Sequence, residues 1–313
     1  MNKKHFITMS LLCLMSLTVA AESNLGANCF AIWANGGIAN YIGKTPGAKA
    51  ALGYGGSLGF GYEWRDQTLL VQTGVGIRYT QTGLNADNRV YTLYNQYDSE
   101  GHLMDYQYIE TNRRDVYKQA TIQVPIMVGA HVSGFYFLAG VKANIYAYNQ
   151  SDIKGNYAAQ GVYDILIDPL ANMDNHLYYT NREITSSRKY GMKFNVALSA
   201  ELGGEFRLGE SAGGNVSYMR IGAFADFNVL DDRTTSNNAM LEYPPSFNNT
   251  DMISVLKQND YLHSTAAENP LRQLYAGVKL TFLISSGVKY GCVMCEGGYP
   301  SARDRRRGSR LQR

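Results

Sequence analysis

The feature that most constrains this chain is a period-two alternation between Tyr54 and Trp64. Its even positions are aromatic or apolar, apart from Gly56, and its odd positions are glycine, serine or glutamate. Successive side chains of a strand point to opposite faces, so the run predicts a strand with one apolar face and one face of tiny or charged groups. After a turn at 65–67 the pattern restarts at Leu69 and continues to Thr80. Such strands suit either a soluble sandwich or a membrane barrel with its apolar face toward lipid.

Six further strands are predicted from the same pattern, at 30–42, 116–132, 135–148, 189–208, 216–230 and 273–284. The connections alternate between short ones (65–67, 133–134, 209–214) and long ones (81–115, 149–188, 231–270). Short periplasmic turns and long extracellular loops are typical of outer-membrane barrels, and an even number of strands closes without leaving an edge. The sequence therefore predicts an all-β fold, an eight-stranded antiparallel transmembrane β-barrel with short periplasmic turns and long extracellular loops.

The two ends of the chain differ from its body. A basic start followed by an apolar run at 6–19 and a small-residue pair, Ala20-Ala21, is typical of a secretory signal. We expect a signal peptide at 1–21, an outer-membrane β-barrel domain at 22–286 and a basic periplasmic tail at 287–313. The expected location is the bacterial outer membrane.

Composition excludes several classes of protein. The chain has 32 glycines, 24 tyrosines and 18% charged residues, which fits neither a disordered nor a helical protein. Its net charge of +3 depends on six arginines in the last eleven residues, so the body is slightly acidic. Nothing in this charge distribution favours a nucleic-acid partner.

Charged side chains recur on the face predicted to line the barrel. Because an unpaired buried charge costs several kcal/mol, they are expected to pair with one another. An ion path or a catalytic carboxylate pair is one interpretation, and a salt-bridged plug is the favoured one, since an eight-stranded barrel has little more room than its own side chains fill. The predicted network is Glu63, Arg78, Lys142, Glu201, Glu205, Arg220, Asp226 and Lys279, with Lys193 and Arg207 also facing inward.

The long connections are rich in tyrosine, which supplies large contact area at low entropic cost and is common on recognition surfaces. Connections of this length are often functional. Binding of a glycan, a host surface or a partner protein is one interpretation; packing of the loops into a lid, or an aromatic girdle, is the other. The candidate contact residues are Tyr91, Tyr94, Tyr97, Tyr106, Tyr108, Tyr178 and Tyr179.

The sequence contains no strong catalytic or metal-binding motif. His102, His176 and His263 fall one in each long connection, without the tight spacing of a metal site. The sequence has no phosphate-binding glycine loop and no nucleophile elbow. We therefore expect no enzyme activity, no cofactor and no metal.

Cysteines occur at both ends of the predicted barrel. Cys29 precedes the first strand, and Cys292 and Cys295 follow the last one. Since closure pairs the first and last strands in a compartment that favours disulfides, a bridge between Cys29 and a tail cysteine is one option. The connectivity stays open.

Three segments also resemble a known family: Gly53–Glu63 (GYGGSLGFGYE), Ile122–Gly129 (IQVPIMVG) and Ala276–Leu283 (AGVKLTFL). In this order they resemble the PorT-like outer-membrane β-barrel domain family of Bacteroidota, over Phe30 to Ser286. The resemblance implies an outer-membrane barrel and, for one branch, a part in protein secretion.

The sequence thus leaves several functions open. A structural or surface-interaction role of the loops is the main hypothesis, and an accessory role in outer-membrane secretion or assembly is the alternative. A small porin and an outer-membrane hydrolase are weaker ones. The expected partners are outer-membrane lipid and a cell-surface ligand or secretion-machinery protein.

Overall fold

The computed structural model describes residues 27–44, 47–66, 68–86, 89–97, 102–163, 179–210, 215–233, 240–242, 257–264 and 269–285. Over these residues the regular structure is β-strand apart from one short 3-10 turn, and no helix among them is long and apolar enough to cross a membrane. The predicted signal peptide at 1–21 and the tail at 287–313 lie outside the described residues.

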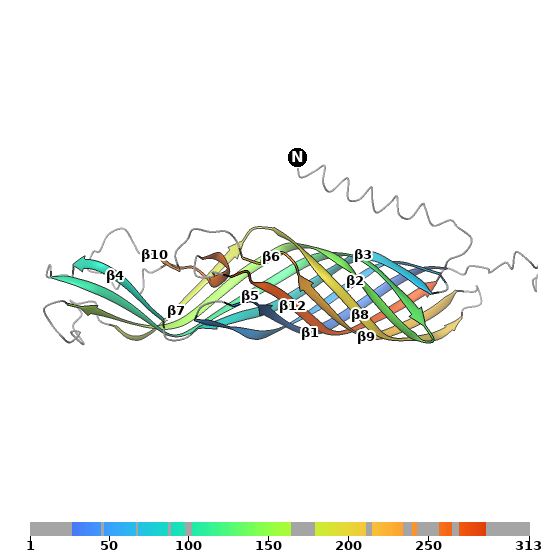
Figure 1. Cartoon of the computed structure of the whole chain (residues 1–313), viewed down its shortest axis with the longest axis horizontal. Coiled ribbons are helices and arrows are strands. Elements are labelled where there is room, and N and C mark those ends of the chain that lie inside the picture. The colour runs from blue at the N-terminus through green and yellow to red at the C-terminus, as the bar shows by residue number, and fades with distance from the viewer. Residues whose placement is uncertain are drawn as a thin grey trace, which may run out of the picture.

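Eight antiparallel strands close into a ring, which forms the right part of the body in Figure 1. Around the ring they follow the order β1-β2-β3-β5-β6-β8-β9-β12, and β12 pairs back onto β1 from Cys29↔Ser285 to Ile42↔Arg272. The all-β prediction and the closed eight-stranded antiparallel sheet are therefore confirmed. The strands are β1 (Ala27–Ile42), β2 (Ala48–Arg65), β3 (Leu69–Ala86), β5 (Leu103–Val132), β6 (Phe135–Val162), β8 (Lys193–Glu210), β9 (Val216–Asn228) and β12 (Arg272–Ser285).

Part of the sheet extends far beyond the ring. β5 and β6 have 30 and 28 residues, which at about 3.3 Å per residue corresponds to roughly 100 and 90 Å. Where β3 stops pairing with β5, at Ala86, β4 (Arg89–Tyr97) continues on the same edge, and β7 (Tyr179–Tyr190) precedes β8 along β6 in the same way. We call β4, β7 and the outer ends of β5 (103–115) and β6 (153–162) the projecting sheet; it forms the left part of Figure 1.

The projecting sheet corrects the prediction that 81–115 and 149–188 are loops. Most of the described residues in these two segments are strand. The period-two pattern was obscured by two β-bulges, at Thr111 in β5 and at Ala147 in β6, where two successive residues face outward. A bulge shifts the alternation by one residue, so β5 resembled a polar segment followed by a shorter strand, and β6 a shorter strand followed by a polar segment.

Within the ring the side chains take the faces that the alternation predicted. The glycines on the inner face of β2 and β3 make room for Trp33 of β1: a Cβ on Gly59 would lie 2.5 Å from the indole ring, and one on Gly74 would lie 2.7 Å from it. The two-residue turn Ser133-Gly134 has φ of 49° and 83°, the left-handed backbone that a tight hairpin requires.

A segment from the third long connection enters the ring at the end that bears the projecting sheet. It comprises β11 (Lys257–Gln258), the 3-10 turn η2 (Tyr261–His263) and Ser264, and we call 257–264 the mouth segment. β11 pairs with β10 (Leu241–Glu242). Tyr261 and Leu262 are buried against side chains from β1, β3 and β5. The predicted loop 231–270 is therefore partly folded into the mouth of the ring.

Candidate functional site

The ring is filled by ion pairs, and the first cluster lies near its short-turn end. Arg220 of β9 pairs with Glu63 of β2 and, at 2.7 Å, with Glu205 of β8. Arg65 contacts the same two carboxylates, Glu63 at 3.1 Å and Glu205 at 2.7 Å. Two acids and two bases from three strands thus neutralise one another across the interior. Arg65 was not foreseen because the predicted strand ended one residue before it, although it has the same inward parity as Glu63.

A second cluster fills the middle of the ring. Asp226 accepts a hydrogen bond from Lys142 at 2.8 Å and lies 3.7 Å from Arg78, while Lys279 pairs with Glu201. All eight residues of the predicted network are therefore placed in ion pairs.

The two additional inward residues behave differently. Lys193 is half-buried near the mouth of the ring and donates to the carbonyl of Arg233 at 3.0 Å. Arg207 keeps the register of the inward-facing Glu205, two residues earlier, but it is exposed because it lies at the short-turn end of the ring. A register shift between Arg207 and Gly209 marks the place where the alternation of β8 breaks down.

The mouth segment is held by a separate group of buried polar contacts. The guanidinium of Arg113 donates to Asp115 at 2.8 Å and to the carbonyl oxygen of Asn259 at 2.8 Å. The backbone N–H of Tyr261 donates to Asp115 at 3.0 Å. These contacts join β5 to a segment almost 150 residues away in sequence, and no periodicity in the sequence indicated them.

Asp260 is the centre of this group. Its carboxylate accepts from Ser151 at 2.7 Å, from Tyr190, and from His263 Nδ1 at 2.7 Å. Burial opposes ionisation, but the hydrogen bonds from His263, Tyr190 and Ser151 outweigh it and lower the pKa of Asp260 below its usual value. The His263 ring also stacks on Tyr190, with ring centroids 3.3 Å apart. The ionised carboxylate of Asp260 therefore holds the mouth segment in place.

Glu110 lies on the inner face of the projecting sheet and is fully buried. Burial raises its pKa to about 7, although Arg113 opposes the shift. The Arg113 Nη1 atom is 3.8 Å away, and the Tyr91 hydroxyl donates at 3.3 Å. Near neutral pH this carboxyl is thus close to its point of half-protonation.

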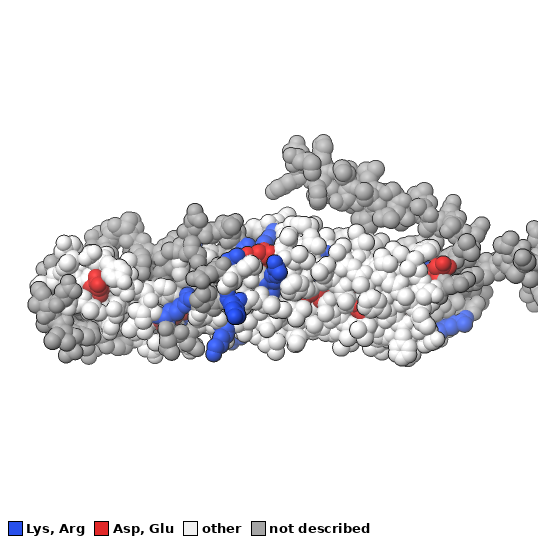
Figure 2. All heavy atoms as spheres, viewed as in Figure 1, with Lys and Arg blue, Asp and Glu red and all other residues white. Residues whose placement is uncertain are grey.

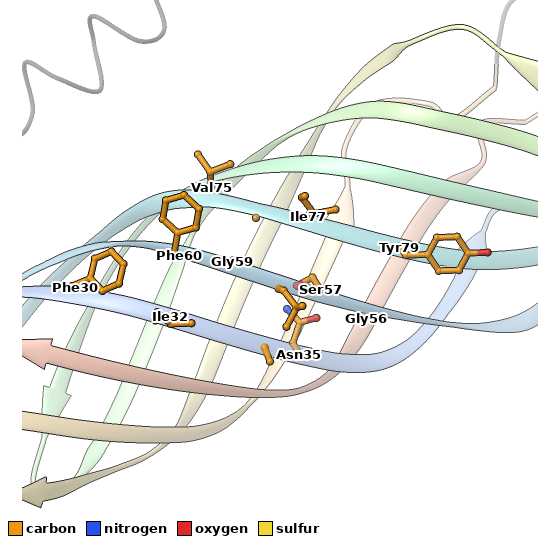
Figure 3. Close-up of a pocket in the computed structure, with 13 residues that line it drawn as sticks. Phe30, Ile32, Asn35, Gly56, Ser57, Gly59, Phe60, Val75, Ile77 and Tyr79 are labelled. Atoms are coloured by element: carbon orange, nitrogen blue, oxygen red, sulfur yellow. The ribbon is translucent and has the colours of Figure 1, made fainter.

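The outer face of the ring has the opposite character. Large apolar side chains are exposed around it, for example Leu58 at 68% and Leu198 at 54%. On the face seen in Figure 2, acidic and basic side chains gather at both ends of the ring and are sparse between them. Over β1, β2 and β3 this surface is hollowed into an apolar groove of about 920 Å³, whose lining includes Gly56, Phe60 and Ile77 (Figure 3).

The predicted tyrosine contacts fall into three groups. Tyr94 and Tyr97 are exposed on β4. Tyr91 is half-buried, whereas Tyr106 and Tyr108 are fully buried on the inner face of the projecting sheet, edge-to-face with ring centroids 4.8 Å apart. Burial removes this last pair from the set of exposed contact residues, because the bulge in β5 turns them inward. Tyr179 begins β7, and Tyr178 lies outside the described residues.

The cysteines and histidines are placed as follows. Cys29 is buried and has no disulfide among the described residues; Cys292 and Cys295 lie outside them. His102 is exposed, His263 is buried at the mouth, and His176 lies outside the described residues. In the part of the chain that the structure describes, no group of three or more histidine, cysteine or acidic side chains could hold a metal ion.

Comparisons with known proteins give little more. No protein-family model matches the chain, and no curated protein sequence matches it significantly. Among solved structures it aligns with the secretin InvG of the Salmonella SPI-1 type III secretion injectisome in the open gate state, at 9% identity over 97% of this chain and 70% of that chain, with a TM-score of 0.09. A TM-score of this size supports neither a shared fold nor a shared function.

Proposed function

We propose that the protein is an outer-membrane β-barrel that holds the projecting sheet outside the cell as a binding platform. The observation that carries this proposal is the inverted distribution of side chains in the ring: ion pairs inside and large apolar side chains outside. A water-soluble closed sheet would bury the apolar side chains, since their burial is the main driving force of folding in water. Contact with lipid around the ring removes the same apolar side chains from water.

The dimensions support this proposal. A transmembrane strand needs about 9–11 residues, and β9 and β12 have 13 and 14. Three exposed tyrosines, Tyr54, Tyr79 and Tyr148, come from β2, β3 and β6, where the apolar surface gives way to the projecting sheet. Aromatic girdles of this kind mark the interface of a barrel with the membrane. The groove in Figure 3 then faces the acyl chains of lipid.

The interior favours a binding role over conduction. Oppositely charged side chains pair across the ring at 2.7–3.7 Å, and among the residues that the structure describes they leave no row of unpaired charges for an ion to follow. The projecting sheet, in contrast, carries exposed tyrosines at its far end and polar residues on its outer face. We infer that it is the part that meets other molecules.

Surface labelling in intact cells tests the topology. Tyr94→Cys places a thiol on the projecting sheet, and Thr68→Cys places one at the opposite end, both at exposed positions, in a variant without the native cysteines. An impermeant maleimide is expected to label only the first site in intact cells and both sites after the outer membrane is permeabilised. Equal labelling of both sites in intact cells, or recovery of the protein in the soluble fraction, would refute the proposal.

A further inference from the structure

Five basic side chains lie on the outer face of the sheet, where the projecting sheet joins the ring. They are Lys49 of β2, Arg114 and Lys118 of β5, Lys154 of β6 and Lys189 of β7. Four of them are exposed, and Lys118 is half-buried. On the face seen in Figure 2, basic side chains gather at this junction. We call these five residues the basic patch.

Strand register arranges the basic patch in two rows that cross the sheet. In the row farther from the ring, each residue is directly opposite the next: Lys49, Asn85, Arg114 and Lys154. The row nearer to the ring is built in the same way from Gln81, Lys118, Gln150 and Lys189. Residues directly opposite each other on antiparallel strands share a face. The patch is therefore one continuous surface that extends from β2 to β7.

The patch carries an excess of positive charge. Arg114 and Lys154 are like charges directly opposite each other, an arrangement that destabilises a sheet because the two Cβ atoms are only about 4.5–5.5 Å apart. Among the described residues, the acid between the two rows is Asp152, and Lys118 already binds it at 2.6 Å. The next acid along β7, Glu183, is opposite Asn156 rather than a basic residue. An anion at this surface would offset the repulsion.

The nearer row directly follows the tyrosines of the aromatic girdle. Tyr79 and Tyr148 lie two residues from Gln81 and Gln150 along β3 and β6, which corresponds to about 6.6 Å. The headgroup layer of a bilayer extends roughly 5–8 Å beyond the hydrocarbon on each side, so this row is at headgroup level. The farther row lies about 13 Å higher along the tilted strands, and long basic side chains can bend back toward the headgroups.

The opposite end of the ring has a different charge distribution. Among the described residues at that end, Arg207 is the exposed Lys or Arg. Arg65 and Arg220 are buried in ion pairs inside the ring. Clustered basic side chains are therefore a property of the end that bears the projecting sheet.

We propose that the basic patch binds the anionic headgroups of the lipids that surround the ring. The apolar groove extends from Phe30 to Tyr79 of the girdle (Figure 3), so a lipid with its acyl chains on this face has its headgroup at the level of the patch. A phosphate between Arg114 and Lys154 would replace their repulsion by charge-assisted hydrogen bonds. A soluble anion would gain nothing from the adjoining apolar face. In taking the ring as embedded in a membrane, this inference rests on the proposed function.

Native mass spectrometry of the full-length protein in neutral detergent micelles tests the patch. Phosphatidylglycerol is expected to bind at least tenfold more tightly than phosphatidylcholine with the same acyl chains. A basic residue near an anionic surface contributes about fivefold in affinity, so Lys49→Gln combined with Lys154→Gln should weaken phosphatidylglycerol binding at least tenfold. Because it removes one of two opposed like charges, this change should not lower the unfolding midpoint in neutral detergent. Arg207→Gln, at the opposite end, is the matched control and should bind normally.

Equal affinities for the two lipids would overturn the inference, and so would unchanged phosphatidylglycerol binding by the double variant. Glycerophosphoglycerol, the same headgroup without acyl chains, is expected to bind at least tenfold more weakly than the lipid. Equal binding of the two would assign the patch to a soluble anion and refute a lipid site. Headgroup selectivity in micelles does not depend on cellular location, so the labelling experiment and this one fail independently.

Discussion

β5 and β6 run through both the ring and the projecting sheet, but the two regions differ in the side chains on their inner and outer faces. In the ring, β5 and β6 present apolar side chains such as Ile126 and Phe137 outward and polar or charged ones inward. In the projecting sheet, the same two strands turn tyrosines such as Tyr106 and Tyr157 inward and polar residues outward. Since the backbone pairing is continuous, the difference reflects the surroundings of each part: lipid around the ring, as we propose, and water around the projecting sheet.

The largest effect is expected from the ion pairs of the ring. Arg220→Met leaves Glu63 and Glu205 with only Arg65 between them, and breaking a buried network in this way costs about 3–5 kcal/mol. Urea unfolding of the reconstituted protein measures the loss. Arg114→Met, at an exposed position of the projecting sheet, should change the stability by less than about 0.5 kcal/mol. Equal effects of the two changes would contradict the distinction between the regions.

The outer face of the ring should respond strongly to charge. Leu198→Arg places a guanidinium on the proposed lipid-facing surface, where it costs about 2–4 kcal/mol near the middle of the membrane. Asn112→Arg makes the same kind of change on the water-facing side of the projecting sheet and should be nearly neutral. The unfolding free energy of both variants in lipid vesicles is the measurement. If Leu198→Arg were also neutral, this face of the ring would not contact lipid.

A pH response should arise in the projecting sheet. Because the folded protein raises the pKa of Glu110 to about 7, the neutral form is favoured by folding, and its contribution to stability is complete below the unfolded pKa of about 4.3. That contribution falls as the pH rises toward 7, by roughly 3–4 kcal/mol in total, and is constant above it. Urea unfolding between pH 4.5 and 8 is expected to show this loss. In Glu110→Gln the loss of stability with rising pH should be smaller by that amount. If this variant had the same pH profile as the wild type, Glu110 would ionise with an ordinary pKa.

The smallest expected effect concerns the glycines that accommodate Trp33. Gly59→Ala places a Cβ 2.5 Å from the indole ring, and overpacking of this kind costs about 1–3 kcal/mol. Gly56→Ala points to the outer groove, where the nearest atom is 3.4 Å away, and should cost little. Unfolding midpoints of the two variants distinguish them, and Trp33→Leu should partly rescue Gly59→Ala. A failure of rescue would mean that the indole is not the obstacle.

The sequence predicted the fold better than the candidate site. Alternation assigned the inner and outer faces of the ring correctly because a closed sheet offers each side chain only two directions. The alternation failed at Thr111 and Ala147, because a bulged residue reverses the face of every later side chain in the strand. The β4–β5 and β6–β7 hairpins were therefore predicted as loops. The basic patch was missed for the same reason: Arg114 and Lys154 lie in the segments predicted as loops, and only the strand register sets them opposite each other.

By itself, the sequence determined the strand type, the pairing of opposite charges inside the ring and the apolar character of its outer face, because these follow from local alternation and from the cost of unpaired buried charge. Only the tertiary structure decided that the four strands of the projecting sheet extend beyond the ring. It alone also decided that Asp260 anchors the mouth segment beside β5, β6 and β7. Contacts such as Arg113 to Asn259 join residues far apart in the chain, and they depend on bulges and register, which no local pattern specifies.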